Sequence, residues 1–397
     1  MSQRDRLRAA LPPRRDAGVC HCQLTPSNLL AHTNPRDEDN LSVLTFTSSG
    51  IYCPDADLYI DPWRPVARAL ITHGHSDHAR PGHGRYVATE TAAPVIRHRL
   101  GAIDLTAIAF GETLVVNGIE ISFHPAGHIP GSAQIRLARR GEVWVVSGDY
   151  KTAPDALSEP FAPIRCHAFV TECTFGLPVF VWPSEDEVIA EMIAWWRDNA
   201  AQGRVSVLGA YSLGKAQRLI ARLAGTIGPI FTHGAVEETN AVMRAQGLPL
   251  PDTIRVTPDL DRGSYKGGLV IAPPSALGTT WLRRFGETST AFASGWMAVR
   301  GIRRRRAADR GFVVSDHVDW PSLNNAIAAT GAERIFVTHG YTAVMRRWLA
   351  EQGYDARVVE TEFQGESLDM PGTNGQAADA ASVDAEPDDR DTSGDAP

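Results

Sequence analysis

The segment Ala67–His78, with the sequence ARALITHGHSDH, carries the strongest structural signal in the chain. An apolar run typical of a β-strand is followed within six residues by His73, His75, Asp77 and His78. Alternate side chains of an extended backbone share a face, so the first two histidines can converge on one ion. Imidazole and carboxylate ligands favour Zn²⁺ or Mn²⁺. We therefore predict a metal site at the end of a strand, with a chance histidine cluster on a solvated loop as the alternative.

Two further ligand candidates occupy similar settings. His128 lies in HPAGHIPGSA and Asp149 lies in VVSGDY, each beside glycine at or after an apolar run. A side chain in such a place can be aimed from a rigid strand edge into a cleft. Either residue alone would more often be a turn residue. They become candidate metal ligands because they occur together with the histidine-rich loop at 73–78.

These motifs resemble the metallo-β-lactamase-fold hydrolases. Asp61 in IDP, the loop at 73–78, His128 and Asp149 are similar to the four ordered motifs of that superfamily. This resemblance covers about residues 41–175.

The second half narrows the resemblance to the β-CASP nucleases. Glu172 in VTECTFG, His317 in VVSDHVDW and His339 in IFVTHGY resemble motifs A, B and C of that subgroup, which hydrolyses phosphodiesters of DNA or RNA. The segments TFTSSGIYCP and ASGWMAVRG resemble the bacterial ligase-associated DNA exonucleases, the DNA damage response exonuclease group. The whole resemblance covers about residues 41–365.

The resemblance implies a two-metal site and a general acid. The implied ligands of one ion are His73, His75 and His128, those of the other are Asp77, His78 and His339, and Asp149 bridges both ions. Asp61 is expected to orient a ligand imidazole, and Glu172 to orient His317, which protonates the leaving oxygen. Two divalent ions, Zn²⁺ with Mn²⁺ as the alternative, are expected to share a hydroxide that attacks the phosphodiester.

Basic and hydroxyl side chains supply candidate nucleic-acid contacts. Ser212 and Lys215 lie in AYSLGKAQRL, which resembles the phosphate-contacting helix start of the β-CASP subgroup. Arg303 and Arg304 belong to a run of six arginines between 300 and 310 that can follow a phosphate backbone. The alternatives are a solvated lysine at a helix start and a solvated arginine-rich loop.

The implied fold class is α/β, an αββα metallo-β-lactamase sandwich with an inserted α/β β-CASP cap. The expected divisions are a poorly ordered extension at 1–40, the first part of the sandwich at 41–177, the cap at 178–309, the second part at 310–370 and an acidic disordered tail at 371–397. Local signals include a hairpin at Asn117-Gly118. They also include helices at Ser184–Asn199, with a Ser184/Glu187 capping box, and at Gly214–Ala224.

Composition limits the function classes. The chain has 397 residues and a net charge of −7, and the segment 371–397 alone holds seven acidic residues and one arginine. Residues 1–370 are therefore close to neutral, which does not favour a globally basic nucleic-acid binder. No apolar stretch reaches the ~18 residues of a membrane span, and we expect no secretory signal and no membrane partner. Five scattered cysteines fit a reducing compartment, so we expect a cytoplasmic protein.

The expected function is a DNA exonuclease in repair, acting on single-stranded DNA or end-bearing duplex. A DNA ligase of the ATP-dependent class and a helicase are the expected functional associates. An RNA-processing nuclease is the first alternative, because RNA-acting members of the resembled family carry histidine where His339 stands. A small-molecule hydrolase of the same fold is the second, but it needs no counterpart of Glu172, His317 or Lys215. A non-catalytic scaffold would have lost ligands, and this sequence keeps the full set.

Overall fold

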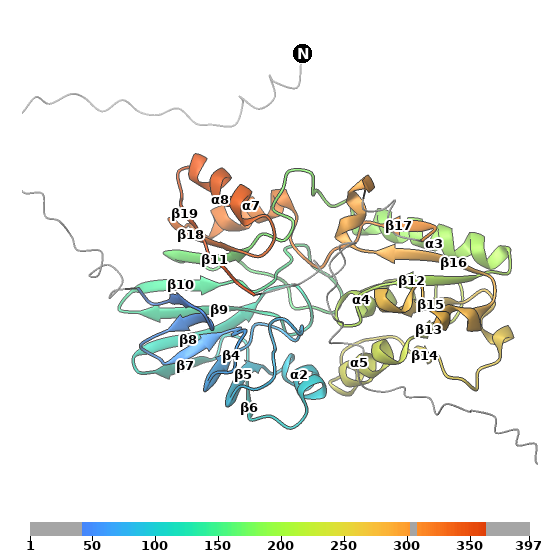
Figure 1. Cartoon of the computed structure of the whole chain (residues 1–397), viewed down its shortest axis with the longest axis horizontal. Helices are drawn as coiled ribbons and strands as arrows, with labels where there is room; N and C mark the ends of the chain where they lie inside the picture. Colours follow the sequence, from blue (N-terminus) through green and yellow to red (C-terminus); the bar gives the residue numbers. More distant parts are fainter. Residues whose placement is uncertain (1–41, 302–307, 363–397) are drawn as a thin grey trace, which may run out of the picture. The chain divides into compact units, whose positions relative to one another are not determined.

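Three β-sheets and six α-helices account for the regular structure of the described residues, which are 42–301 and 308–362 of a computed structural model (Figure 1). The predictions for the extension at 1–40 and the tail at 371–397 lie outside these residues. None of the helices in the described ranges is long and apolar enough to cross a membrane.

The first sheet has six strands that pair in chain order. They are β1 (Thr45–Thr47), β2 (Gly50–Cys53), β3 (Leu58–Ile60), β4 (Arg68–Leu70), β5 (Arg85–Thr89) and β6 (Leu105–Ile108). Strands β1 to β3 are antiparallel, and β3 to β6 are parallel. The loop that carries the candidate metal ligands follows β4, an inner strand that pairs with β3 and β5.

The second sheet has seven strands in the order β19-β18-β11-β10-β9-β8-β7. They are β7 (Thr113–Val116), β8 (Ile119–Pro125), β9 (Ala133–Arg139), β10 (Glu142–Val146), β11 (Ala168–Glu172), β18 (Arg334–Thr338) and β19 (Asp355–Val358). Positive φ angles at Asn117 and Gly118 make the tight turn between β7 and β8, as the sequence predicts. Strands β10, β11, β18 and β19 are parallel, so their carboxyl ends meet at one edge of the sheet.

The first two sheets share one hydrophobic core. Ile51 and Leu70 of the first sheet pack in the same cluster as Phe123 and Trp144 of the second. On its other face the first sheet packs against α2 (Ala93–Leu100). The second sheet's other face packs against α7 (Trp320–Thr330) and α8 (Thr342–Glu351). The layers therefore run helix, sheet, sheet, helix.

The third sheet is all parallel, in the order β14-β13-β15-β12-β16-β17. Its strands are β12 (Val205–Gly209), β13 (Ile230–Thr232), β14 (Ile254–Arg255), β15 (Leu269–Ala272), β16 (Thr288–Ala293) and β17 (Arg310–Phe312). The helices along this segment are α3 (Glu185–Ala201), α4 (Lys215–Leu223) and α5 (Gly234–Ala245). Short 3-10 turns lie at Arg262–Tyr265, Pro274–Ala276, Thr280–Phe285 and Gly295–Ala298. Every residue of β12 is buried, as in a central parallel strand.

The third sheet interrupts the second one along the chain. The chain leaves the second sheet after β11 and returns to it at β18, which pairs directly with β11. Strand β17 pairs with β16, so the third sheet reaches Phe312, past the expected boundary at 309. The sequence Arg-Gly-Phe has no apolar alternation that would have predicted this strand. The Ser184/Glu187 capping box predicted for α3 is confirmed.

Candidate metal centre

The candidate ligands and Glu172 lie at or after the ends of five strands. His73, His75, Asp77 and His78 lie on the loop after β4, and the backbone turns there through bonds from the amides of 78 and 79 to the His75 carbonyl. Asp149, Glu172 and His339 stand at the carboxyl ends of the parallel strands β10, β11 and β18. The parallel pairing thus brings together residues that are far apart in sequence. His128 follows β8.

A glycine lets the Asp149 loop approach the histidine loop. Gly148 has a φ of +57°, and a Cβ on it would lie 2.7 Å from the Cβ of Thr72. Any side chain at 148 would push Asp149 away from the cluster, so the small residue beside the acid has a steric reason.

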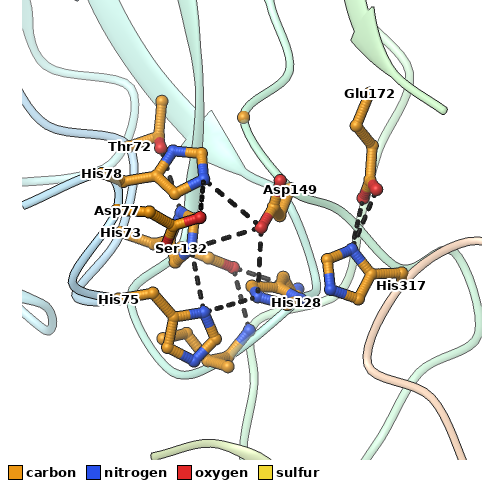
Figure 2. A network of polar contacts seen from close by, with 12 residues as sticks. Thr72, His73, His75, Asp77, His78, His128, Ser132, Asp149, Glu172 and His317 are labelled. Carbon is orange, nitrogen blue, oxygen red and sulfur yellow. Dashed lines mark hydrogen bonds and ion pairs between the residues drawn. The ribbon is translucent and has the colours of Figure 1, made fainter. Parts of the chain in front are cut away.

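The first pocket is formed by His73, His75, His128 and Asp149 (Figure 2). One ligand atom from each lies within 4.8 Å of the others. His73 Nε2 and His128 Nε2 each lie 3.1 Å from His75 Nδ1. Nitrogens bound to one tetrahedral zinc at about 2.05 Å would be about 3.3 Å apart. The three imidazoles therefore have the spacing of ligands to a single ion.

The ring tautomers show why this pocket suits a cation. His75 Nε2 lies 3.0 Å from the carbonyl oxygen of Leu213, and His128 Nδ1 lies 2.8 Å from that of Asp316. A carbonyl oxygen only accepts hydrogen bonds, so these two nitrogens carry the protons. In neutral rings His75 Nδ1 and His128 Nε2 are then bare and face each other. Two lone pairs in contact repel, and a shared divalent ion removes that repulsion.

The rings of the first pocket are held neutral by their surroundings. Burial, with a smaller effect of neighbouring imidazoles, lowers the pKa of His73 and of His128 well below the ordinary value. Burial also lowers the pKa of His75. A neutral imidazole is the form that binds metal, so the pocket is in its binding form at neutral pH.

The second pocket is formed by Asp77, His78 and His339, whose ligand atoms also lie within 4.8 Å of one another. Asp149 lies between the two pockets. Its Oδ2 is 3.6 Å from His73 Nε2, 3.4 Å from His78 Nε2 and 3.8 Å from His128 Nε2. Its Oδ1 is 3.6 Å from His339 Nδ1 and accepts no hydrogen bond within the described residues. One carboxylate thus lies beside the ligand atoms of both pockets, and its bridging role stays a prediction.

The two pockets differ in charge. Burial lowers the pKa of His78, but the carboxylates of Asp149, Asp77 and Asp61 together raise it well above the ordinary value. Burial raises the pKa of Asp149, but the surrounding histidines hold it well below the ordinary value. A carboxylate-rich second pocket is therefore built for positive charge, which a divalent ion supplies as well as a proton does.

Asp61 fixes two of the histidine rings. Its Oδ2 lies 2.8 Å from His78 Nδ1, which donates to it, and 2.5 Å from Thr72 Oγ1. The Thr72 hydroxyl donates to Asp61 and so accepts from His73 Nδ1 at 3.0 Å. Both rings thus turn their Nε2 atoms toward Asp149. Carboxylate partners of this kind set the tautomer and orientation of metal-binding histidines.

His317 and Glu172 form a buried pair beside the first pocket (Figure 2). His317 Nδ1 donates to the carboxylate of Glu172, 2.8 Å from Oε2 and 3.0 Å from Oε1. The same carboxylate accepts the Tyr150 amide at 2.8 Å and the Thr174 hydroxyl at 2.5 Å. The His317 ring centre is 4.7 Å from that of His128. An imidazole with a fixed Nδ1 proton can exchange a proton with substrate through Nε2.

Comparisons with known proteins identify the family. No protein-family profile matches the chain. A probable DNA ligase of Opitutus terrae is 30% identical over 321 residues, which are 80% of this chain and 31% of that protein. The human DNA cross-link repair 1A protein is 25% identical over 40% of this chain and 16% of its own length. An RNase J-like protein of Methanocaldococcus jannaschii is 23% identical over 48% of this chain and 44% of its own length.

The chain belongs to the metallo-β-lactamase-fold β-CASP family. It spans less than half the length of each of these relatives. A crystal structure of a protein of unknown function from Enterococcus faecalis V583 matches 74% of this β-CASP chain and 79% of its own, with a TM-score of 0.52 and 10% identity. That likeness concerns the fold alone.

Two of the predicted nucleic-acid contacts of this β-CASP chain, Ser212 and Lys215, flank Leu213, whose carbonyl accepts from His75. Lys215 is completely buried, with its Nζ 3.8 Å from Asp316 Oδ2. An ammonium in that position faces a carboxylate inside the protein, and the phosphate contact of Lys215 stays a prediction. Ser212 is half-buried. Arg303 and Arg304 lie outside the described residues.

Sequence reasoning missed three groups that hold the ligands in this β-CASP chain. The Thr72 hydroxyl donates to Asp61 and accepts from His73. The carbonyls of Leu213 and Asp316 accept from His75 and His128. Thr72 directly precedes the histidine loop, so its position was a usable signal. A backbone carbonyl has no sequence signature, and only the fold reveals the other two.

Proposed function

We propose that this protein is a two-metal phosphodiester hydrolase, and specifically a DNA exonuclease in repair. The observation that carries the proposal is a single carboxylate, Asp149, shared by two histidine-lined pockets, with the His317–Glu172 pair beside them. The relatives named for DNA cross-link repair and DNA ligation support DNA as the substrate. A single-stranded or end-bearing DNA is the proposed form.

The finer architecture belongs to the same proposal. The layers of the first two sheets and their helices support an αββα sandwich, divided into segments 41–177 and 310–370. The third sheet supports an inserted cap at 178–309, extended to Phe312 by strand β17. Substrate would then reach the metal centre between sandwich and cap.

The donor set supports Zn²⁺ as the resident metal, with Mn²⁺ as the alternative. Histidine nitrogens dominate the first pocket, which suits zinc, while the carboxylates near the second pocket also suit manganese. His73, His75, His128 and Asp149 would hold one ion, and Asp77, His78, His339 and Asp149 the other. When bound, two divalent ions supply an acidified water and neutralise charge on the phosphodiester.

The chain's own residues then perform the proton transfer. His317, its Nδ1 proton held by Glu172, would donate its Nε2 proton to the leaving sugar oxygen. Glu172 keeps the imidazolium favourable, because a carboxylate beside an imidazole stabilises the charged ring. The amide of Tyr150 and the hydroxyl of Thr174 hold Glu172 in place. A deoxyribose oxygen is a poor leaving group, so this proton is worth about 10²–10⁴ in rate.

An RNA-processing nuclease is the second candidate. His339 takes part in the second pocket, and histidine at this motif accompanies RNA-acting members of the resembled family. The RNase J-like relative supports the same reading. Functional association with a DNA ligase is supported by the O. terrae relative. The proposed helicase partner and the cytoplasmic location remain predictions from the sequence.

The decisive experiment tests the full chain, first freed of metal by a chelator, on one nucleotide sequence prepared as single- and double-stranded DNA and RNA. Labelled single- and double-stranded DNA and RNA are incubated with Zn²⁺, Mn²⁺ or Mg²⁺. We expect metal-dependent release of nucleotides from a DNA end. The Asp149→Asn variant should cleave DNA at least 100-fold more slowly than wild type. It should also fail to retain its bound ions. Asp104→Asn, at an exposed ion pair with Arg85, is the matched control and should behave as wild type. No cleavage with any metal, or an active Asp149→Asn variant, contradicts the proposal.

A further inference from the structure

The start of helix α4 touches the first pocket directly. The Leu213 carbonyl accepts the Nε2 proton of His75 at 3.0 Å. The next residue, Gly214, has a φ of +94°, and a Cβ on it would lie 2.2 Å from the side chain of Ile129. Ile129 follows the ligand His128 in the chain. Only glycine lets the helix start approach the His128 loop so closely.

The same helix also reaches His128 through Asp316. Arg218 Nη1 lies 2.6 Å from Asp316 Oδ1 and donates to the Ser315 carbonyl at 3.1 Å. Lys215 Nζ lies 3.8 Å from Asp316 Oδ2. The backbone carbonyl of Asp316 in turn accepts the Nδ1 proton of His128 at 2.8 Å. Two cationic side chains thus hold the residue whose carbonyl sets the His128 ring.

This ion cluster is buried. Lys215 is 0% exposed, Arg218 6% and Asp316 3%. Removing such charges from water carries a desolvation cost that their attraction often only offsets. Apolar side chains of the same size often stabilise a fold as well as buried ion pairs do. The charges are therefore better explained by the position they impose on the 315–316 backbone than by stability.

We propose that the segment Leu213–Arg218, which leads into α4 and forms its first turn from Lys215 onward, is a positioning element for the His75 and His128 ligands. It fixes both tautomers and points His75 Nδ1 and His128 Nε2 at the same place (Figure 2). Affinity for the ion of the first pocket then depends on Lys215, Arg218 and Asp316. This inference rests on the proposed function, because it requires that the pocket bind a metal.

The second pocket provides an internal reference. Its His78 is oriented by Asp61 at 2.8 Å, from the loop after β3 rather than from α4. Loss of the α4 contacts should therefore weaken the first ion more than the second. Since α4 follows β12 of the third sheet, ion binding and the seating of that segment against the pocket are linked, and each favours the other.

The test compares Arg218→Met with Arg222→Met in the full chain. Both replace an arginine of α4 with an apolar chain of similar length, but Arg222 is partly exposed and pairs with Glu185 and Asp186. Calorimetric titration of Zn²⁺ into the metal-free chain measures both affinities. We expect Arg218→Met to weaken one ion about 10- to 100-fold and leave the other within a few fold. Arg222→Met should change neither, and Arg218→Lys should recover part of the loss.

A second measurement gives its deciding result in the wild type alone. Long-range ¹H–¹⁵N spectra of the metal-free wild type, with ¹⁵N-labelled histidine, report which ring nitrogen carries the proton. We expect His75 protonated at Nε2 and His128 at Nδ1, and a mixture of tautomers at His128 in Arg218→Met. The opposite tautomers in the wild type overturn the inference, even if the variant does not fold.

The outcomes separate the two proposals. A wild-type chain that binds no divalent ion overturns the proposed function. A wild type that binds two ions, together with an Arg218→Met variant that binds both with unchanged affinity, overturns only the positioning role of α4. Selective loss of one ion in Arg218→Met supports both.

Discussion

The orientation of the histidine rings of the first pocket is fixed by the hydrogen bond that each ring donates on its outer side. Each ring of the first pocket donates one proton outward, to a hydroxyl or to a carbonyl, and so presents its other nitrogen inward. Asp61, a buried acid in the left-handed region with a φ of +42°, serves His78 directly and His73 through Thr72. Strained backbone at a residue that fixes two ligands is consistent with a functional demand on its position.

The Thr72 relay gives a prediction at this scale. Thr72→Val keeps the shape but removes the hydroxyl between Asp61 and His73, so the His73 ring loses its fixed tautomer. We expect zinc affinity to fall about 10-fold or more, because second partners of metal-binding histidines carry effects of that size. Thr72→Ser, which keeps the hydroxyl, should bind zinc nearly as wild type. Competition with a chromophoric chelator measures both. Equal zinc affinity in wild type and Thr72→Val would show that the Thr72 hydroxyl does not contribute to metal binding.

The proposed acid gives a second prediction. His317→Ala should retain both ions yet cleave DNA about 10²–10⁴ times more slowly, because the leaving oxygen then departs unprotonated. A 4-nitrophenyl phosphodiester, whose leaving group needs no proton, should slow far less. His98→Ala, at an exposed position of α2, is the control. If His317→Ala lowers the single-turnover rates of both substrates by the same factor, His317 is not the general acid.

At the scale of elements, polar side-chain contacts tie helices to neighbouring strands. Helix α5 shows how such an element is fixed in the third-sheet segment. Glu237 on α5 accepts from Thr232 at the end of β13, from Thr253 before β14 and from Arg244 about two turns along the helix. Burial raises the pKa of Glu237, but these donors together lower it. The ionised carboxylate therefore ties one helix to two strands.

This tie predicts a pH-dependent stability. A carboxyl group with a lowered pKa contributes stability above its unfolded value of about 4.3 and loses that contribution as pH falls through the native value. We expect Glu237→Gln to cost on the order of 2 kcal/mol in free energy of unfolding at pH 7. The difference from wild type should shrink below about pH 4. Urea titrations at several pH values measure it, with Glu238→Gln, at a partly exposed position, as control. A pH-independent difference contradicts this origin.

Over the whole molecule, the metal centre joins all three sheets. Its residues follow β4 of the first sheet and β10, β11 and β18 of the second, while Leu213 lies between β12 and α4. The two pockets together contain five histidines and two aspartates, with imidazole lone pairs that face one another and carboxylates whose charge is not balanced. Divalent ions neutralise both features, so metal binding and folding stability are coupled.

Metal removal should therefore lower the thermal stability of the entire β-CASP chain. Zinc at 100 times its dissociation constant adds about 2.7 kcal/mol per site if it binds only the folded state. We expect the unfolding temperature to rise by several degrees when zinc is restored after chelation, in differential scanning calorimetry. Asp149→Asn, which lacks the shared ligand, should show little of this rise. If neither the chelator nor added zinc changes the unfolding temperature, the stability of the chain does not depend on bound ions.

Local patterns in the sequence were enough for the ligand loop at 73–78, the Asn117-Gly118 hairpin and the capping box at Ser184, because each depends on neighbours a few residues apart. Strands β12 to β17 and helix α2 were not assigned residue by residue, since a short buried strand has no distinctive period. Only the tertiary structure decided that Lys215 is buried against Asp316 and that distant backbone carbonyls orient His75 and His128. Pairings between segments a hundred or more residues apart follow from packing of the whole chain, and no local stretch encodes them.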